Sequence, residues 1–121
     1  MAGVDDTREL VRLIVEECWA DAAGLDRMYE HVADSYVHHS PFGDWDFAQF
    51  RRGLEWVDSR IANRTYRAQQ IVVEGDRAAA FILWSGSGRA DGLPVEGRGA
   101  YHCRTRDGRI QEDWDIFSPG G

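Results

Sequence analysis

The first part of the chain carries its apolar residues at helical spacing. From Leu10 to Trp19 they follow the three- and four-residue steps of a helix, after a capping-box pattern made by Asp6 and Glu9. Gly24 interrupts this pattern, and a shorter helix is predicted over residues 25–32. The chain therefore begins with two helices, each with one apolar side.

The next segment predicts a short extended piece and then a long amphipathic helix. Residues 35–40 are expected to be extended, and Pro41 ends them. Asp46 and Gln49 form a second capping-box pattern. One apolar stripe follows it, made of Phe47, Phe50, Leu54, Val57 and Ile61. Such a stripe is typical of a helix that packs one face on a core.

The second half of the chain has the pattern of strands. Four strands are predicted, over residues 65–74, 77–89, 95–106 and 109–117. Asp107-Gly108 between the last two is a strong hairpin signal. The second strand is apolar on both faces from Ala78 to Trp84, so we expect helices on one side of it and a partner subunit on the other.

Helices followed by an antiparallel meander indicate an α+β fold in a single domain, residues 1–121. We expect three helices packed on one face of a strongly curved sheet, which would leave a conical cavity for a ligand. The length of 121 residues and an apolar share of 43% suit one domain with its own core.

Charge narrows the possible chemistry. All 14 basic residues are Arg, and they stand against 21 acidic residues for a net charge of −7. Without Lys the chain can form neither a Schiff base on a side-chain amine nor a P-loop. The acidic balance argues against a nucleic-acid partner. Any base in the cavity must then be Asp, Glu, His or Tyr.

The chain also lacks the signals of membrane or secreted proteins. No apolar run approaches the length of a membrane span, and the N-terminus does not have the pattern of a signal peptide. Cys18 and Cys103 form neither a metal motif nor a disulfide framework. We therefore expect a reduced, cytoplasmic protein with no membrane partner.

Four short segments together resemble a known family. They read YVHHSP at 36–41, IVVEGDR at 71–77, RTRDGRI at 104–110 and EDWDIF at 112–117. They resemble the SnoaL-like polyketide cyclases of the nuclear-transport-factor-2-like superfamily, which also contains the ketosteroid isomerases. The resemblance covers nearly the whole chain and implies an NTF2-like (cystatin-like) α+β barrel with a conical cavity.

The resemblance also implies catalytic residues. In these cyclases an Asp on the last strand is the acid/base of an intramolecular aldol closure, and it corresponds to Asp113. A His commonly follows Tyr-Val-x, which selects His39 as the cavity-facing histidine. Asp113 would remove a proton from a carbon flanked by carbonyls, while His39 and Tyr101 would hydrogen-bond the oxyanion. Ring closure, isomerisation and dehydration share this step, and none of them needs a cofactor.

Strand alternation groups the candidate residues. Asp113, Asp115 and Phe117 share one face of the last strand, and Tyr101 lies on the same face of its neighbour. The two carboxylates would lie roughly 6 to 7 Å apart and raise each other's pKa. On the Tyr101 strand, glycines 97 and 99 would leave room for a ligand.

Histidines and aromatic residues complete the expected cavity. His38 and His39 are adjacent and extended, so they point opposite ways, and no metal site is expected. Trp84 lies in phase with the cavity face, and Phe42 and Trp45 lie in the loop that would form a lid. The predicted substrate-binding residues are Trp84, Trp56, Phe42, Trp19, Asp115 and Phe117. As a group they suit a small apolar or aromatic substrate that contains a carbonyl group, although each aromatic could also be ordinary core.

Two alternatives remain open. Epoxide hydrolysis on the same fold would need an inward-facing Arg, for which Arg67 is the candidate. A non-catalytic ligand-binding or dimerisation domain would have Asp113 paired or exposed and a cavity filled by aromatics. In either case Trp114 and Ile116, on the outer face of the last strand, are expected to meet a second copy of the chain in a homodimer.

Overall fold

The computed structural model describes residues 4–118 of the chain. The helical segments are α1 (Val4–Leu13), a π-helical turn (Ile14–Cys18), α2 (Ala22–Met28), a 3₁₀ turn (Tyr29–His31) and α3 (Phe47–Asp58). The strands are β1 (Val32–Ser40), β2 (Gly43–Trp45), β3 (Ile61–Glu74), β4 (Arg77–Gly88), β5 (Pro94–Arg106) and β6 (Arg109–Phe117).

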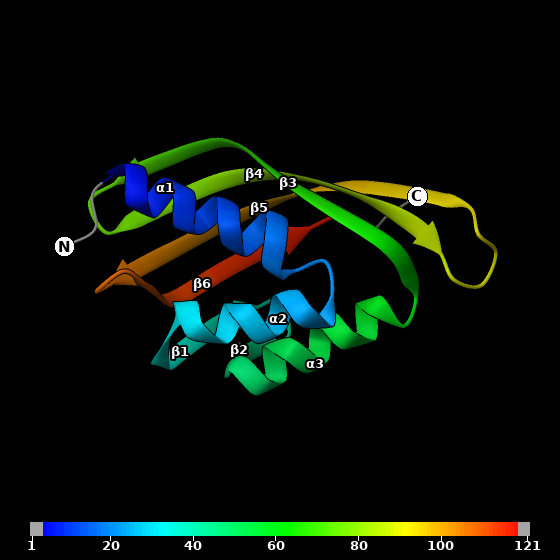
Figure 1. Ribbon diagram of the computed structural model, residues 1–121, viewed down its shortest axis with the longest axis horizontal. Helices are drawn as coiled ribbons and strands as arrows, with labels where there is room; N and C mark the ends of the chain where they lie inside the picture. The colour runs from blue at the N-terminus through cyan, green and yellow to red at the C-terminus, as the bar shows by residue number, and fades with distance from the viewer. Residues whose placement is uncertain (1–3, 119–121) are drawn as a thin grey trace.

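The strands form one curved, open sheet in the order β2-β1-β6-β5-β4-β3. All neighbours are antiparallel except β1 and β6, which run parallel. Figure 1 shows the helices gathered on one face of this sheet, with α1 lying across the long strands and α2 beside α3. The predicted α+β class is confirmed, and the core fills the space between α1 and the sheet.

The long helix formed as predicted from Phe47 to Asp58, but Ile61, the last residue of the predicted stripe, lies on β3. Asp46 caps α3 by accepting from the backbone N–H of Gln49 at 2.8 Å, and the Gln49 side chain returns a bond to the Asp46 backbone N–H. The first helix differs, because α1 already includes Val4 and so Asp6 lies inside it rather than at its cap.

The prediction that Gly24 interrupts the helices was wrong, because this residue lies inside α2. Gly24 is buried, and a Cβ there would strike the backbone carbonyl oxygen of Glu17. The glycine therefore serves close packing of α2 against the preceding turn. Asp21 is the N-cap of this helix, and its side chain accepts from the Gly24 N–H at 2.7 Å.

The strands follow their predicted ranges, except that β1 and β3 begin at Val32 and Ile61, before the predicted starts at residues 35 and 65. The Asp107-Gly108 hairpin forms with positive φ at both residues, 54° and 75°. Thr105 pairs with Ile110 and Arg104 with Glu112, so Gln111 is the extra residue of a bulge. The bulge turns Ile110 into the core, where it is 0% exposed, although strict alternation along the strand would place it on the same outer face as Trp114 and Ile116.

Among the described residues, no helix is long and apolar enough to cross a membrane.

Candidate active site

A cavity of about 640 Å³ lies between α3, the β1–β2 hairpin and the concave side of the sheet. Its wall is mostly aromatic. All the residues predicted to bind substrate lie on this wall, namely Trp84, Trp56, Phe42, Trp19, Asp115 and Phe117. The wall also contains His38, Tyr66 and Trp45. The predicted substrate-binding residues therefore gather on one wall, whereas the predicted catalytic residues Asp113, Tyr101 and His39 are not among its lining residues.

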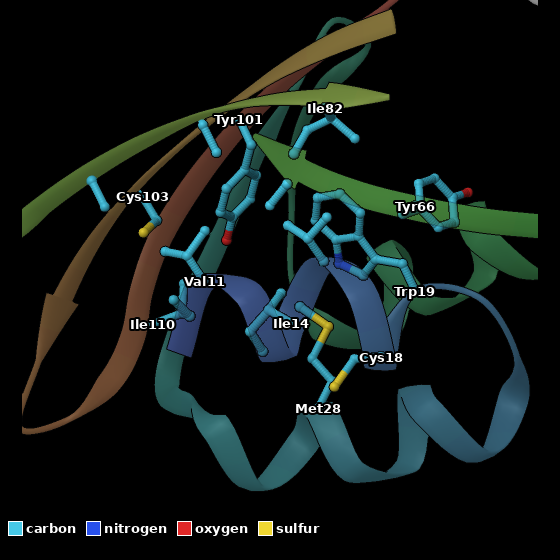
Figure 2. Close-up of a cluster of buried hydrophobic side chains, with 14 of the residues drawn as sticks. Val11, Ile14, Cys18, Trp19, Met28, Tyr66, Ile82, Tyr101, Cys103 and Ile110 are labelled. Atoms are coloured by element: carbon cyan, nitrogen blue, oxygen red, sulfur yellow. The ribbon is translucent and has the colours of Figure 1, made fainter. Parts of the chain in front are cut away.

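Asp113 lies beneath the cavity rather than on its wall. The residue is 0% exposed, and three donors converge on its carboxylate. Tyr36 Oη donates to it at 2.9 Å and Tyr101 Oη at 2.8 Å, while His38 Nδ1 lies 2.6 Å from Oδ1. Because donors face both oxygens, the arrangement favours the ionised carboxylate. Figure 2 shows the Tyr101 ring deep in the core beside Trp19.

The histidine of the site is His38, and the expectation that His39 faces the cavity was wrong. On the parallel β1–β6 ladder His38 lies opposite Asp113, and His39 lies opposite Trp114 on the outer face. His38 is 2% exposed and lines the cavity. Its second ring nitrogen, Nε2, lies 3.5 Å from Asp115 Oδ1. The strand thus inserts His38 between two inward-facing carboxylates of β6.

His39 belongs to the outer surface. Its Nδ1 lies 2.8 Å from Asp44 on β2, and its Nε2 lies 2.8 Å from Glu112 on β6. The imidazole stacks on Trp114, with ring centroids 4.6 Å apart. Hydrogen bonding to Glu112 is the main cause that raises the pKa of His39. These contacts tie the β1–β2 hairpin to the sheet and leave His39 away from the cavity.

The two carboxylates keep His38 charged. Burial on its own would lower the pKa of His38, but the bonds to Asp113 and Asp115 outweigh it and raise the pKa to about 9. The pKa of Asp113 is raised by burial, against the opposing effect of its donors, and not by a neighbouring carboxylate as expected. At neutral pH His38 is therefore an imidazolium with both N–H groups directed at carboxylates.

Tyr101 faces inward as predicted, but its hydroxyl is already engaged with Asp113. Burial raises the pKa of both Tyr36 and Tyr101 well above the ordinary value, so both phenols remain donors. Tyr36 was not predicted. Its position two residues before His38, on the same strand face, is the signal that could have identified it.

The glycines of β5 make room for protein side chains rather than for a ligand, which corrects the expectation. A Cβ at Gly97 would lie 2.6 Å from Nε1 of Trp84, and one at Gly99 would strike the ring of Phe117. Both aromatic rings therefore lie over glycines and form the cavity wall. The packing of Trp84 on Gly97 and of Phe117 on Gly99 thus forms part of the cavity wall, and the two glycines do not add to the space for a ligand.

Two aromatic residues at the rim of the cavity are exposed. Phe42 is 86% exposed and Trp56 is 58% exposed, although both line the cavity. Phe42 stacks on Trp45, which lies on β2 rather than in a loop. The region predicted as a lid is therefore a short hairpin.

No arginine lies on the cavity wall in the described part of the chain. Arg67 is exposed on β3, so the inward arginine that epoxide hydrolysis would need is not supplied by this residue. The buried arginine is Arg64, which sequence reasoning missed, and it binds Asp58 at 2.8 Å behind the wall. Within residues 4–118 no group of three His, Cys, Asp or Glu side chains is placed to hold a metal ion.

Comparisons with known proteins identify the family and the fold of the chain. A family model described as "SnoaL-like domain" matches residues 11–113. A search of curated protein sequences finds no match.

Solved structures show the same fold at low sequence identity. IdmH, a candidate polyketide cyclase from Streptomyces antibioticus, has a TM-score of 0.81 at 22% identity, over 93% of this chain and 91% of its own. AclR, a candidate hydroxylase from Streptomyces galilaeus, has a TM-score of 0.79 at 18% identity, over 97% and 77%. A protein of Catenulispora acidiphila with a ketosteroid isomerase-like fold, solved with trimethylamine, has a TM-score of 0.77 at 18% identity, over 91% of this chain and 85% of its own.

Proposed function

The chain belongs to the SnoaL-like domain family, and on that premise we propose that it is a cofactor-independent acid/base enzyme acting on a small, largely apolar carbonyl compound. The reaction is an intramolecular aldol cyclisation, or a related isomerisation or dehydration. All three begin with loss of a proton beside a carbonyl group. The observation that carries the proposal is the pair of His38 and Asp115 on a wall that is otherwise largely apolar.

His38 supplies the acid. Its Nε2–H faces the cavity side of the cluster, where a substrate carbonyl oxygen would take the place of the long 3.5 Å contact to Asp115. An imidazolium donor stabilises the negative charge that develops on this oxygen as the neighbouring carbon loses its proton. The apolar residues of the wall lower the local dielectric constant, which strengthens this interaction.

Asp115 is the base. It is the carboxylate on the cavity wall, and its side chain is 16% exposed. Asp113 does not touch the substrate in this scheme, since it is fully buried. Asp113 instead fixes the orientation and charge of His38 and is a positioning residue, and Tyr36 and Tyr101 hold Asp113 in turn.

The proposal is tested by proton exchange on a flat ketone. 2-Acetylnaphthalene is incubated with the protein in D₂O, and loss of the methyl signal is followed by NMR. The wild-type protein is expected to accelerate exchange by about 100-fold or more over buffer, the usual gain from a positioned acid or base. His38→Gln should return the rate to background, while the neighbouring His39→Gln should retain it.

Equal acceleration by the wild-type protein and His38→Gln would contradict the proposed role of His38. Binding of the ketone without any acceleration would favour the non-catalytic alternative. The measured quantity is the exchange rate at saturating protein, so weak binding is not mistaken for lack of catalysis.

We also propose that two copies of the chain pair through the outer face of the sheet. Phe81, Ala100 and Ile116 lie side by side across β4, β5 and β6. Ile116 is 71% exposed and Phe81 is 39% exposed, so the row is an uncovered apolar strip. Ile116→Arg is expected to shift sedimentation from dimer to monomer, and a wild-type monomer at micromolar concentration would contradict this.

Both cysteines are free and buried, in keeping with the proposed cytoplasmic location.

A further inference from the structure

A second polar group lies on the cavity wall, on β3 rather than β6. Tyr66 lines the cavity and is only 8% exposed. Its hydroxyl oxygen accepts a hydrogen bond from Nε of Arg64 at 3.1 Å. In Figure 2 the Tyr66 hydroxyl points away from Tyr101 and from the aliphatic core around Ile14. This hydroxyl therefore lies apart from the cluster around Asp113.

Arg64 is held in place by three further acceptors. Its side chain is 1% exposed, and it binds Oδ1 of Asp58 at 2.8 Å and the backbone oxygen of Trp19 at 3.0 Å. A weaker bond reaches the backbone oxygen of Ile61 at 3.3 Å. The guanidinium is thus a fixed positive charge directly behind the phenol.

The Tyr66 proton has no acceptor within residues 4–118. A guanidinium has donors only, so Arg64 cannot take this proton. Burial raises the pKa of Tyr66, with Arg64 acting in the opposite direction, so the phenol stays protonated at neutral pH. A buried O–H without an acceptor is costly unless a ligand or water completes it. The hydroxyl is therefore a hydrogen-bond donor that is available to an oxygen atom of a ligand in the cavity.

We infer that Tyr66, supported by Arg64, binds a second carbonyl oxygen of the substrate. The inference rests on the proposed function and narrows it. One carbonyl would lie at His38 and the other at Tyr66, so the substrate is a dicarbonyl compound. In the intramolecular aldol closure, the first of the proposed reactions, this second carbonyl is the electrophile that the enolate attacks.

The closure balances with the groups present. Asp115 takes the proton from the carbon beside the first carbonyl, whose oxygen is bound by His38. The carbon–carbon bond forms to the second carbonyl carbon as its π bond breaks, and that electron pair goes to the oxygen at Tyr66. Tyr66 and Arg64 stabilise this alkoxide, which takes up one proton. The proton removed by Asp115 is returned through solvent, so the product has the same atoms as the substrate.

The test compares ligands that differ by one carbonyl. Dissociation constants are measured by quenching of tryptophan fluorescence for 2-acetylnaphthalene and for 2,6- and 2,7-diacetylnaphthalene. At least one diketone is expected to bind about three- to tenfold tighter than the monoketone, the gain of one added hydrogen bond. Tyr66→Phe removes only the hydroxyl and should abolish this gain while leaving monoketone binding within about twofold.

Tyr29→Phe is the matched control, because Tyr29 is 66% exposed and lies outside the cavity wall. It should keep the diketone advantage. The ratio of the two constants is measured on the same protein sample, so partial unfolding of a variant cancels. A wild-type protein without any diketone advantage, or an advantage that survives in Tyr66→Phe, would overturn the inference. The proton-exchange test of His38 uses the monoketone alone, so its failure would leave the result on Tyr66 standing.

Discussion

Two adjacent histidines on β1 have opposite environments. His38 is 2% exposed and lies between Asp113 and Asp115, whereas His39 is 26% exposed and lies between Asp44 and Glu112. Each imidazole has both nitrogens directed at carboxylates. The partners of His38 lie inside the fold, and the His38 ring lines the cavity. The partners of His39 lie at the surface, where they join the β1–β2 hairpin to the rest of the sheet.

The two histidines make the same type of contact and differ in burial. Burial therefore distinguishes the candidate site around His38 from the surface contacts of His39. A charge pair at the surface is worth little because water and salt screen it. The same pair inside the protein must satisfy every donor and acceptor, and losing one partner leaves a buried charge uncompensated. Removing a partner of His38 should therefore lower the free energy of unfolding much more than removing a partner of His39.

The largest expected effect follows from Asp113→Asn. This change keeps the shape of the side chain but leaves the buried His38 imidazolium without its closest partner. Loss of one partner of a buried pair typically costs about 3 to 5 kcal/mol in the free energy of unfolding. Chemical denaturation at pH 7 measures this loss. Glu112→Gln is the outer counterpart, and an equal loss in both variants would remove the distinction between the two histidines.

The next effect is a loss of stability at high pH. The pKa of His38 is raised from 6.5 to about 9 by folding, so its contribution is fully present below pH 6.5 and is lost as pH rises through about 9. A shift of this size corresponds to about 3 kcal/mol. Denaturation curves between pH 6 and 10 should show the decline in the wild-type protein and a smaller one in His38→Gln. Identical slopes in the two proteins would contradict the buried imidazolium.

A smaller effect is expected from Tyr36→Phe. The variant removes one of the donors that satisfy Asp113 and leaves the ring in place. Losing a hydrogen bond to a buried charged group costs about 1 to 3 kcal/mol. Urea denaturation should place its free energy of unfolding between those of the wild-type protein and Asp113→Asn. A Tyr36→Phe protein as stable as wild type would show that the Asp113 carboxylate does not depend on this donor.

The smallest effect belongs to His39→Gln. Its partners are exposed or half-buried, and exposed pairs contribute about 0 to 1 kcal/mol. The free energy of unfolding should therefore change by less than about 1 kcal/mol. The decline of stability between pH 6 and 10 should remain as in wild type. Loss of that decline in His39→Gln would mean that the outer histidine carries the pH dependence.

Much of the fold could be predicted from the sequence because local signals set it. The capping box at Asp46 and the Asp107-Gly108 turn act over a few residues, and both formed as expected. The aromatic wall could also be predicted, since alternation along β4 and β6 places Trp84, Asp115 and Phe117 on the concave face.

The choice between His38 and His39 could not be made from local pattern. Val37 and His39 are as compatible with an inward face as Tyr36 and His38, because apolar and polar residues occur in both sets. The face is fixed by the parallel pairing of β1 with β6, which joins His38 to Asp113 across 75 positions of the chain. The bulge at Gln111 also depends on this long-range pairing, and it decides which β6 residues face inward.

The most direct test of the account is the pH titration of His38 by NMR, with its ring protons assigned against His38→Gln. We expect a pKa of about 9 for His38 in the wild-type protein and a clearly lower value in Asp113→Asn. A His38 that titrates at or below 6.5 and does not respond to Asp113→Asn would contradict the central claim that a carboxylate-held imidazolium forms the polar end of the cavity.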